Sequence, residues 1–79
     1  MISIAVYNMI YFTKYAEQKF EILNKHKVYF TREQIENVIK LPESLKKKEK
    51  LFLACSEGIC VVYRKEGDII KVLTFYPVS

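Results

Sequence analysis

The chain contains little of what most catalytic and metal-binding motifs are built from. Its 79 residues include one histidine, two cysteines, two glycines and two prolines. Gly58 and Gly67 stand in short breaks between apolar runs, so the sequence has no Gly-rich phosphate loop and no nucleophile elbow. No metal-ligand spacing is present, and a Ser–His–acid site would have only His26 as its base. We therefore expect no metal and no cofactor.

The two cysteines, Cys55 and Cys60, fall in consecutive expected strands on either side of a short turn. Cross-strand pairing is geometrically conceivable, but strand cysteines are more often small buried hydrophobic residues. The apolar start, residues 1–12, lacks a basic segment and a cleavage site, and it is too short to span a bilayer. We therefore expect a cytoplasmic protein with reduced thiols and no membrane partner.

What the chain does have is apolar and basic residues. Apolar residues make up 51% and aromatic residues 14%, which is enough for one compact core, so residues 1–79 are expected to form a single domain. A domain this small buries a modest share of its surface, which favours dimerisation. The net charge of +4 permits an anionic partner such as RNA without requiring one.

The longest apolar span, residues 51–76, consists of three β-branched and aromatic runs separated by two short glycine-containing breaks. This pattern predicts a three-stranded antiparallel meander that ends at Pro77. A further strand is expected in Ile2–Phe12, with Asn8 as a bend and the clearest pairing at Met9–Phe12.

Two helices are expected between the first strand and the meander. The first spans Thr13–His26, with Thr13 as its cap and basic residues at its end. The second spans Thr31–Leu41 and opens with a capping box formed by Thr31 and Gln34. Together these elements predict an α+β fold of βααβββ order, with an antiparallel sheet and both helices packed on one face.

Both faces of the meander are largely apolar, and charge enters only at Arg64 and Lys71. A sheet with one solvated face would show a polar residue at every second position. The helices can cover one face, so we expect the other to meet a partner chain or to form a shallow concave surface.

The segment Glu43–Lys50 is expected to be an exposed, mobile connection between the second helix and the meander. Its lysines can keep a neighbouring strand edge soluble, or they can contact phosphates. The candidate phosphate-binding residues are Lys46, Lys47, Lys48, Lys50, Arg64 and Lys71.

A metal-independent ribonuclease would need cations around a phosphate and a group that transfers protons. The chain could supply Tyr15, Lys19, Arg64 and Tyr76 as such a catalytic set, with Lys71 beside them. Because a tyrosine has an ordinary pKa of about 10, it is a poor base at neutral pH unless nearby cations lower that value.

The order FTKYAEQKF, NKHKVYFTREQIENVIKLPE and ICVVYRKEGDIIKVLTFYP resembles an uncharacterised family of small domains related to RelE-type toxins, over residues 9–77. The resemblance implies a RelE-like sheet with two packed helices. Tyr15 and Lys19 stand where the family pattern has His and Arg, so this chain lacks that imidazole and that guanidinium.

Two functional hypotheses follow. The first is a non-catalytic interaction module of toxin–antitoxin ancestry, which forms a homo-oligomer or binds an antitoxin-like protein. The second is an RNA-binding protein or a metal-independent endoribonuclease.

Overall fold

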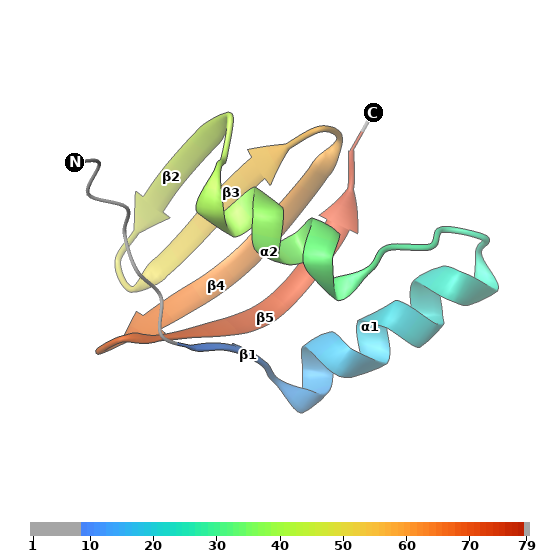
Figure 1. Ribbon diagram of the computed structural model, residues 1–79, viewed down its shortest axis with the longest axis horizontal. Coiled ribbons are helices and arrows are strands. Elements are labelled where there is room, and N and C mark those ends of the chain that lie inside the picture. Colours follow the sequence, from blue (N-terminus) through green and yellow to red (C-terminus); the bar gives the residue numbers. More distant parts are fainter. Residues whose placement is uncertain (1–8, 79) are drawn as a thin grey trace.

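The computed structural model describes residues 9–78 (Figure 1). The part of the predicted first strand at Ile2–Asn8 lies outside the described residues. The element order is β1 (Met9–Phe12), α1 (Lys14–Lys25), α2 (Arg32–Lys40), β2 (Ser44–Lys48), β3 (Leu51–Ser56), β4 (Ile59–Glu66) and β5 (Ile69–Pro77). The predicted α+β class, the two helices and the three strands of the meander are confirmed.

One five-stranded sheet, ordered β1-β5-β4-β3-β2, forms the centre of the molecule. Strands β2 to β5 pair antiparallel, whereas β1 pairs parallel with β5. The prediction of a fully antiparallel sheet is therefore wrong at β1. No tight turn joins β1 to β5, since both helices and three strands lie between them in sequence, so a hairpin geometry is not imposed.

The prediction of a mobile connection at Glu43–Lys50 is also wrong, because Ser44–Lys48 forms the edge strand β2. All five of its residues are exposed, and its backbone pairs with β3 from Ser44 opposite Cys55 to Lys48 opposite Leu51. Lysine is uncommon in strands and this run has no apolar alternation, so neither signal indicated a strand. The strand β2 is stabilised instead by backbone pairing to the edge of β3 that β4 leaves free.

Helix α1 begins at Thr13, whose side-chain oxygen accepts a hydrogen bond from the Ala16 N–H at 3.2 Å. The same hydroxyl donates to the Val72 carbonyl at 2.9 Å, which fixes the start of α1 against β5. His26 is the C-terminal cap, as predicted, and its N–H donates to the Leu23 carbonyl at 2.9 Å.

Helix α2 begins with the predicted capping box. The Gln34 N–H donates to the Thr31 hydroxyl at 3.1 Å, and the Thr31 N–H donates to the Gln34 side-chain oxygen at 2.9 Å. The helix ends at Leu41, immediately before Pro42, which cannot continue it.

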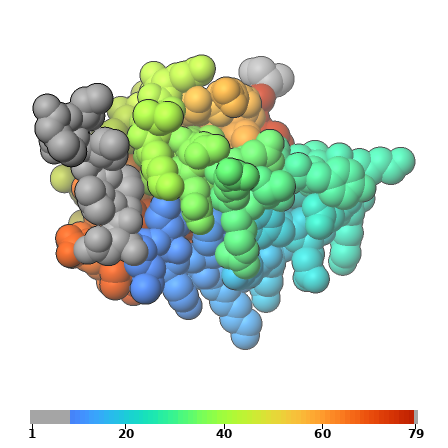
Figure 2. All heavy atoms as spheres, in the orientation of Figure 1, coloured from blue at the N-terminus to red at the C-terminus, as the bar shows by residue number. Residues whose placement is uncertain are grey.

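Both helices pack on the same face of the sheet. Helix α1 contacts β5 and β1, and α2 contacts β3 and β4. In the space-filling view from this side, the two helices lie in front of the meander (Figure 2). The buried core between the layers includes Ala16 and Leu23 of α1, Ile35, Val38 and Ile39 of α2, and Ala54, Ile59, Val61, Tyr63, Ile70, Val72 and Phe75 of the sheet.

A β-bulge in β5 changes which of its residues face the helices. The register moves from Val72 opposite Tyr63 to Thr74 opposite Val62, so Leu73 is an extra residue. Strict alternation along the strand would put Phe75 on the same face as Leu73, but Phe75 is fully buried in the core with Val72. A bulge has no reliable local sequence signal, so the alternation rule failed here.

Candidate interaction surface

The face of the sheet turned away from both helices is called the open face here. Side chains of a strand alternate between the two faces, and cross-strand partners share a face. Since Ala54, Val61 and Tyr63 lie in the core, their sequence neighbours lie on the open face. The open face includes Ser44, Lys46, Lys48, Leu51, Leu53, Cys55, Cys60, Val62, Arg64, Lys71, Leu73, Thr74 and Tyr76, with Tyr11 on the edge strand β1.

The middle of the open face is aliphatic. Leu53 pairs with Val62 across β3 and β4, and Leu51 in the next row remains 43% exposed. Leu73 and Thr74 fill the bulge interval on β5, and both are only half-buried. Because no helix within residues 9–78 covers these side chains, the open face presents apolar surface to solvent or to a partner.

One end of the open face is positively charged. The register aligns Lys48, Leu51, Arg64, Lys71 and Tyr11 in a single row across the sheet. Glu66 forms ion pairs with Arg64, whose Nη2 lies 2.9 Å away, and with Lys71, whose Nζ lies 3.0 Å away. These contacts, chiefly the one from Lys71, lower the pKa of Glu66 below its ordinary value. The carboxylate thus holds two cations side by side in the row.

The sequence did not single out Glu66. It places Arg64 and Lys71 correctly as charged residues on one face of the meander, but both form ion pairs with the carboxylate that precedes the turn at Gly67. The signal that could have found this contact is the predicted hairpin between the second and third strands of the meander. It brings the residues on the two sides of the KEGD turn close together.

The predicted phosphate-binding lysines are divided by the structure. Lys46 and Lys48 lie on the open face, in the same rows as Leu53 and Leu51. Lys47 lies on the helix-covered face instead, with its Nζ 5.4 Å from the centre of the Phe52 ring. Lys50 belongs to the turn between β2 and β3. Two of the four lysines therefore join Arg64 and Lys71 on one surface.

The predicted catalytic set is not brought together. Tyr15 and Lys19 belong to α1, on the helix-covered side, and Tyr15 is 75% exposed there. Arg64 and Tyr76 lie on the open face, where Tyr76 pairs with Cys60 and is separated from Arg64 along the strands. These four residues do not surround one substrate position in this structure.

Cys55 and Cys60 form a disulfide between β3 and β4, with their Cα atoms 4.1 Å apart. The prediction of reduced core thiols is therefore wrong for this structure. The cysteines are direct cross-strand partners around the two-residue turn Glu57–Gly58, and such neighbours approach closely enough to bond. Sequence spacing permitted the pairing but could not fix the register that produces it.

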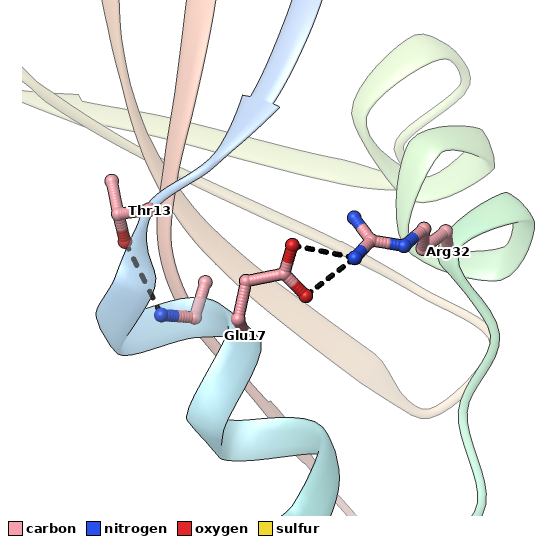
Figure 3. A network of polar contacts seen from close by, with 4 residues as sticks. Thr13, Glu17 and Arg32 are labelled. Atoms are coloured by element: carbon pink, nitrogen blue, oxygen red, sulfur yellow. Dashed lines mark hydrogen bonds and ion pairs between the residues drawn. The ribbon is translucent and has the colours of Figure 1, made fainter.

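On the opposite side of the molecule, Arg32 of α2 reaches Glu17 of α1 (Figure 3). Its Nη2 lies 2.5 Å from both carboxylate oxygens. The guanidinium carbon also lies 4.9 Å from the centre of the Phe12 ring and 5.7 Å from that of Phe20. The hydrogen bond to Glu17 raises the pKa of Arg32, so its charge is secure, and the contact serves to hold the helices together.

Comparisons with family models, with curated proteins and with solved structures found no match to this chain. Within residues 9–78, neither helix is long and apolar enough to cross a membrane, and no group of three or more histidine, cysteine or acidic residues is placed to hold a metal ion. Within the part of the chain that the structure describes, the class it defines is an α+β domain whose mixed five-stranded sheet has both helices on one face.

Proposed function

We propose that this protein is a non-catalytic interaction module with a RelE-like fold, of toxin–antitoxin ancestry, and that the open face binds another protein chain. The partner is a second copy or an antitoxin-like protein. The observation that carries the proposal is the aliphatic middle of the open face, Leu51, Leu53, Val62 and Leu73, which lies outside the helix-covered core.

The composition of this surface favours a protein partner over a small ligand. Protein interfaces combine an apolar centre, depleted in charge, with a charged and polar rim. Here Leu53, Val62 and Leu73 lie between the row that contains Lys48, Leu51, Arg64 and Lys71 and the row that contains Ser44 and Tyr76. A partner that covers the centre would also meet cations at one end, which favours acidic groups at its own rim.

A matched pair of variants tests the proposal. Leu53→Glu places a carboxylate at the centre of the open face, whereas Ile22→Glu makes the same type of change on an exposed residue of α1. If the partner is a second copy, light scattering at micromolar concentration gives a dimer for the wild type and for Ile22→Glu and a monomer for Leu53→Glu.

An antitoxin-like partner is tested with the same pair. Tagged proteins are purified from the source cell, and the partner should be retained by the wild type and by Ile22→Glu but lost from Leu53→Glu. A monomeric wild type, together with an unchanged set of co-purified chains for Leu53→Glu, would contradict the proposal.

A second candidate function is RNA binding, with or without endoribonuclease activity. It is favoured by Lys46, Lys48, Arg64 and Lys71 lying on one face of the sheet. Phosphate contacts release counterions, so the affinity for single-stranded RNA should fall steeply as salt is raised. The variant Lys46→Ala/Lys48→Ala should reduce this salt dependence, while Lys25→Ala/Lys27→Ala, at the end of α1, should not. An affinity that is independent of salt would contradict this candidate.

The cytoplasm remains the proposed compartment, with no membrane partner. Disulfides that occur in the cytosol are usually redox-active and transient. The Cys55–Cys60 bond therefore has to be considered as a reactive group as well as a structural one.

A further inference from the structure

The Cys55–Cys60 disulfide lies on the open face and joins β3 to β4. On their other edges, β3 pairs with β2 and β4 pairs with β5. Cys55 pairs with Ser44 of β2, and Cys60 pairs with Tyr76 of β5. The Glu43 N–H also donates to the Cys55 carbonyl at 2.9 Å. The row Ser44, Cys55, Cys60 and Tyr76 is thus held in register by backbone pairing across four strands as well as by the disulfide.

The covalent bond encloses very little chain. The two cysteines are five positions apart, and the residues between them form the turn of a hairpin that the sheet already fixes. A disulfide stabilises a fold mainly by restricting the unfolded chain, and this restriction is smaller for shorter loops. Reduction of this bond should therefore leave the folded state in place.

The two sulfur-bearing residues differ in their exposure. Cys60 is only 5% exposed, whereas Cys55 is half-buried, and neither helix covers that side of the sheet. Lys46, two positions from Ser44 on the same face of β2, lies diagonally across from Cys55 and adds positive charge near the bond. Because Cys55 is the more exposed of the two residues, an attacking thiolate meets Cys55 first.

We propose that Cys55–Cys60 is a thiol–disulfide exchange site for small thiols of the glutathione type, with Cys55 as the sulfur that is attacked. The incoming thiolate forms a bond to Cys55 Sγ, the Sγ–Sγ bond breaks, and Cys60 leaves as a thiolate that takes a proton from water. A second small thiolate then attacks the sulfur of the first, the bond from that sulfur to Cys55 Sγ breaks, and Cys55 leaves as a thiolate that takes a proton from water. Two electrons pass from two thiols to the protein, which yields two cysteine thiols and one small disulfide.

The proposal predicts reversible exchange in the folded protein. The wild type is equilibrated in mixtures of reduced and oxidised glutathione, quenched with acid, alkylated and weighed by mass spectrometry, while far-UV circular dichroism is recorded in parallel. We expect a titration between the bonded and the fully alkylated forms, reversed when the ratio is reversed, with no change in the dichroism spectrum. A bond that is reduced only after denaturant is added, or a loss of the spectrum on reduction, would overturn the proposal.

The attacked sulfur is tested with two single variants. Cys60→Ser leaves only Cys55, and Cys55→Ser leaves only Cys60. With oxidised glutathione, the thiol of Cys55 should form a mixed disulfide several-fold faster than that of Cys60, and both thiols should react equally fast once the variants are unfolded in urea. Equal rates in the folded variants would overturn the assignment of Cys55.

Discussion

At the scale of single residues, Arg32 illustrates how one side chain stabilises several elements. Its guanidinium contacts Glu17 of α1 and covers the rings of Phe12 and Phe20, which come from β1 and α1. More than half of the Arg32 side chain is exposed, so solvent weakens the ion pair. Water replaces the contact of Arg32 with the two aromatic rings less easily than it replaces the ion pair with Glu17.

Arg32→Ala is expected to lower the free energy of unfolding by about 1 kcal/mol, because it removes a cation–π contact and a partly exposed ion pair. The measurement is urea denaturation followed by circular dichroism. Glu17→Gln, which keeps the ring contact and removes the ion pair, should cost less. Equal losses for the two variants would mean that the rings contribute nothing.

Glu66 gives a prediction about pH. Its folded-state pKa lies below the ordinary value of 4.5, chiefly because of the hydrogen bond from Lys71, so the unfolded chain takes up a proton first as pH falls. The contribution of Glu66 to stability is therefore present above pH 4.5 and is lost as pH falls through the folded-state pKa.

The check for Glu66 is a carboxyl titration by NMR, which should give a midpoint below 4.5. The difference in stability between the wild type and Glu66→Gln should also shrink as pH falls below that value. A midpoint at or above 4.5 would show that Arg64 and Lys71 do not hold the carboxylate in solution.

At the scale of elements, α2 is the one whose limits were clearest from the sequence. Thr31 and Gln34 form their capping box by local contacts, and Pro42 ends the helix by local geometry. Neither signal depends on the rest of the chain, which is why both were predicted correctly.

Thr31→Ala is expected to cost about 1 kcal/mol of stability, because the Gln34 N–H loses its acceptor at the start of α2. Thr31→Ser keeps a hydroxyl at the cap and should remain within a few tenths of a kcal/mol of the wild type. Thermal and urea unfolding of the three proteins measure both effects. Identical stabilities would mean that the capping box contributes little in this fold.

Strand β2 shows the opposite behaviour. Its residues Ser44–Lys48 carry no strand signal, and they become a strand because β3 offers an unpaired edge beside them. The lysines of β2 then disfavour pairing of this outer edge with another sheet. The parallel placement of β1 beside β5 has the same origin, since both depend on which edge of the meander is available.

At the scale of the whole molecule, the Cys55–Cys60 bond should affect stability only modestly. For so short an enclosed loop, the chain-entropy relation gives a loss of about 2 kcal/mol for Cys55→Ser/Cys60→Ser. A domain of this size commonly has about 4–12 kcal/mol of stability, so the variant should fold.

This loss is measured by urea denaturation of the double variant beside the oxidised wild type. The wild type kept in reductant should unfold close to the double variant, because both lack the bond. A double variant that does not fold would show that the sheet cannot hold the β3–β4 register without the bond.

By itself, the sequence determined the local elements. These are two capped helices and a three-stranded meander that turns at Gly58 and Gly67 and has two largely apolar faces. These follow from periodicity, capping and turn chemistry, which act over a few residues. Only the tertiary structure decided the edge strands, the bulge at Leu73, the Cys55–Cys60 bond and the pairing of Glu66 with Arg64 and Lys71. Each of these requires strand register, and register is set by how the whole sheet packs against the helices, so no short stretch of the chain contains it.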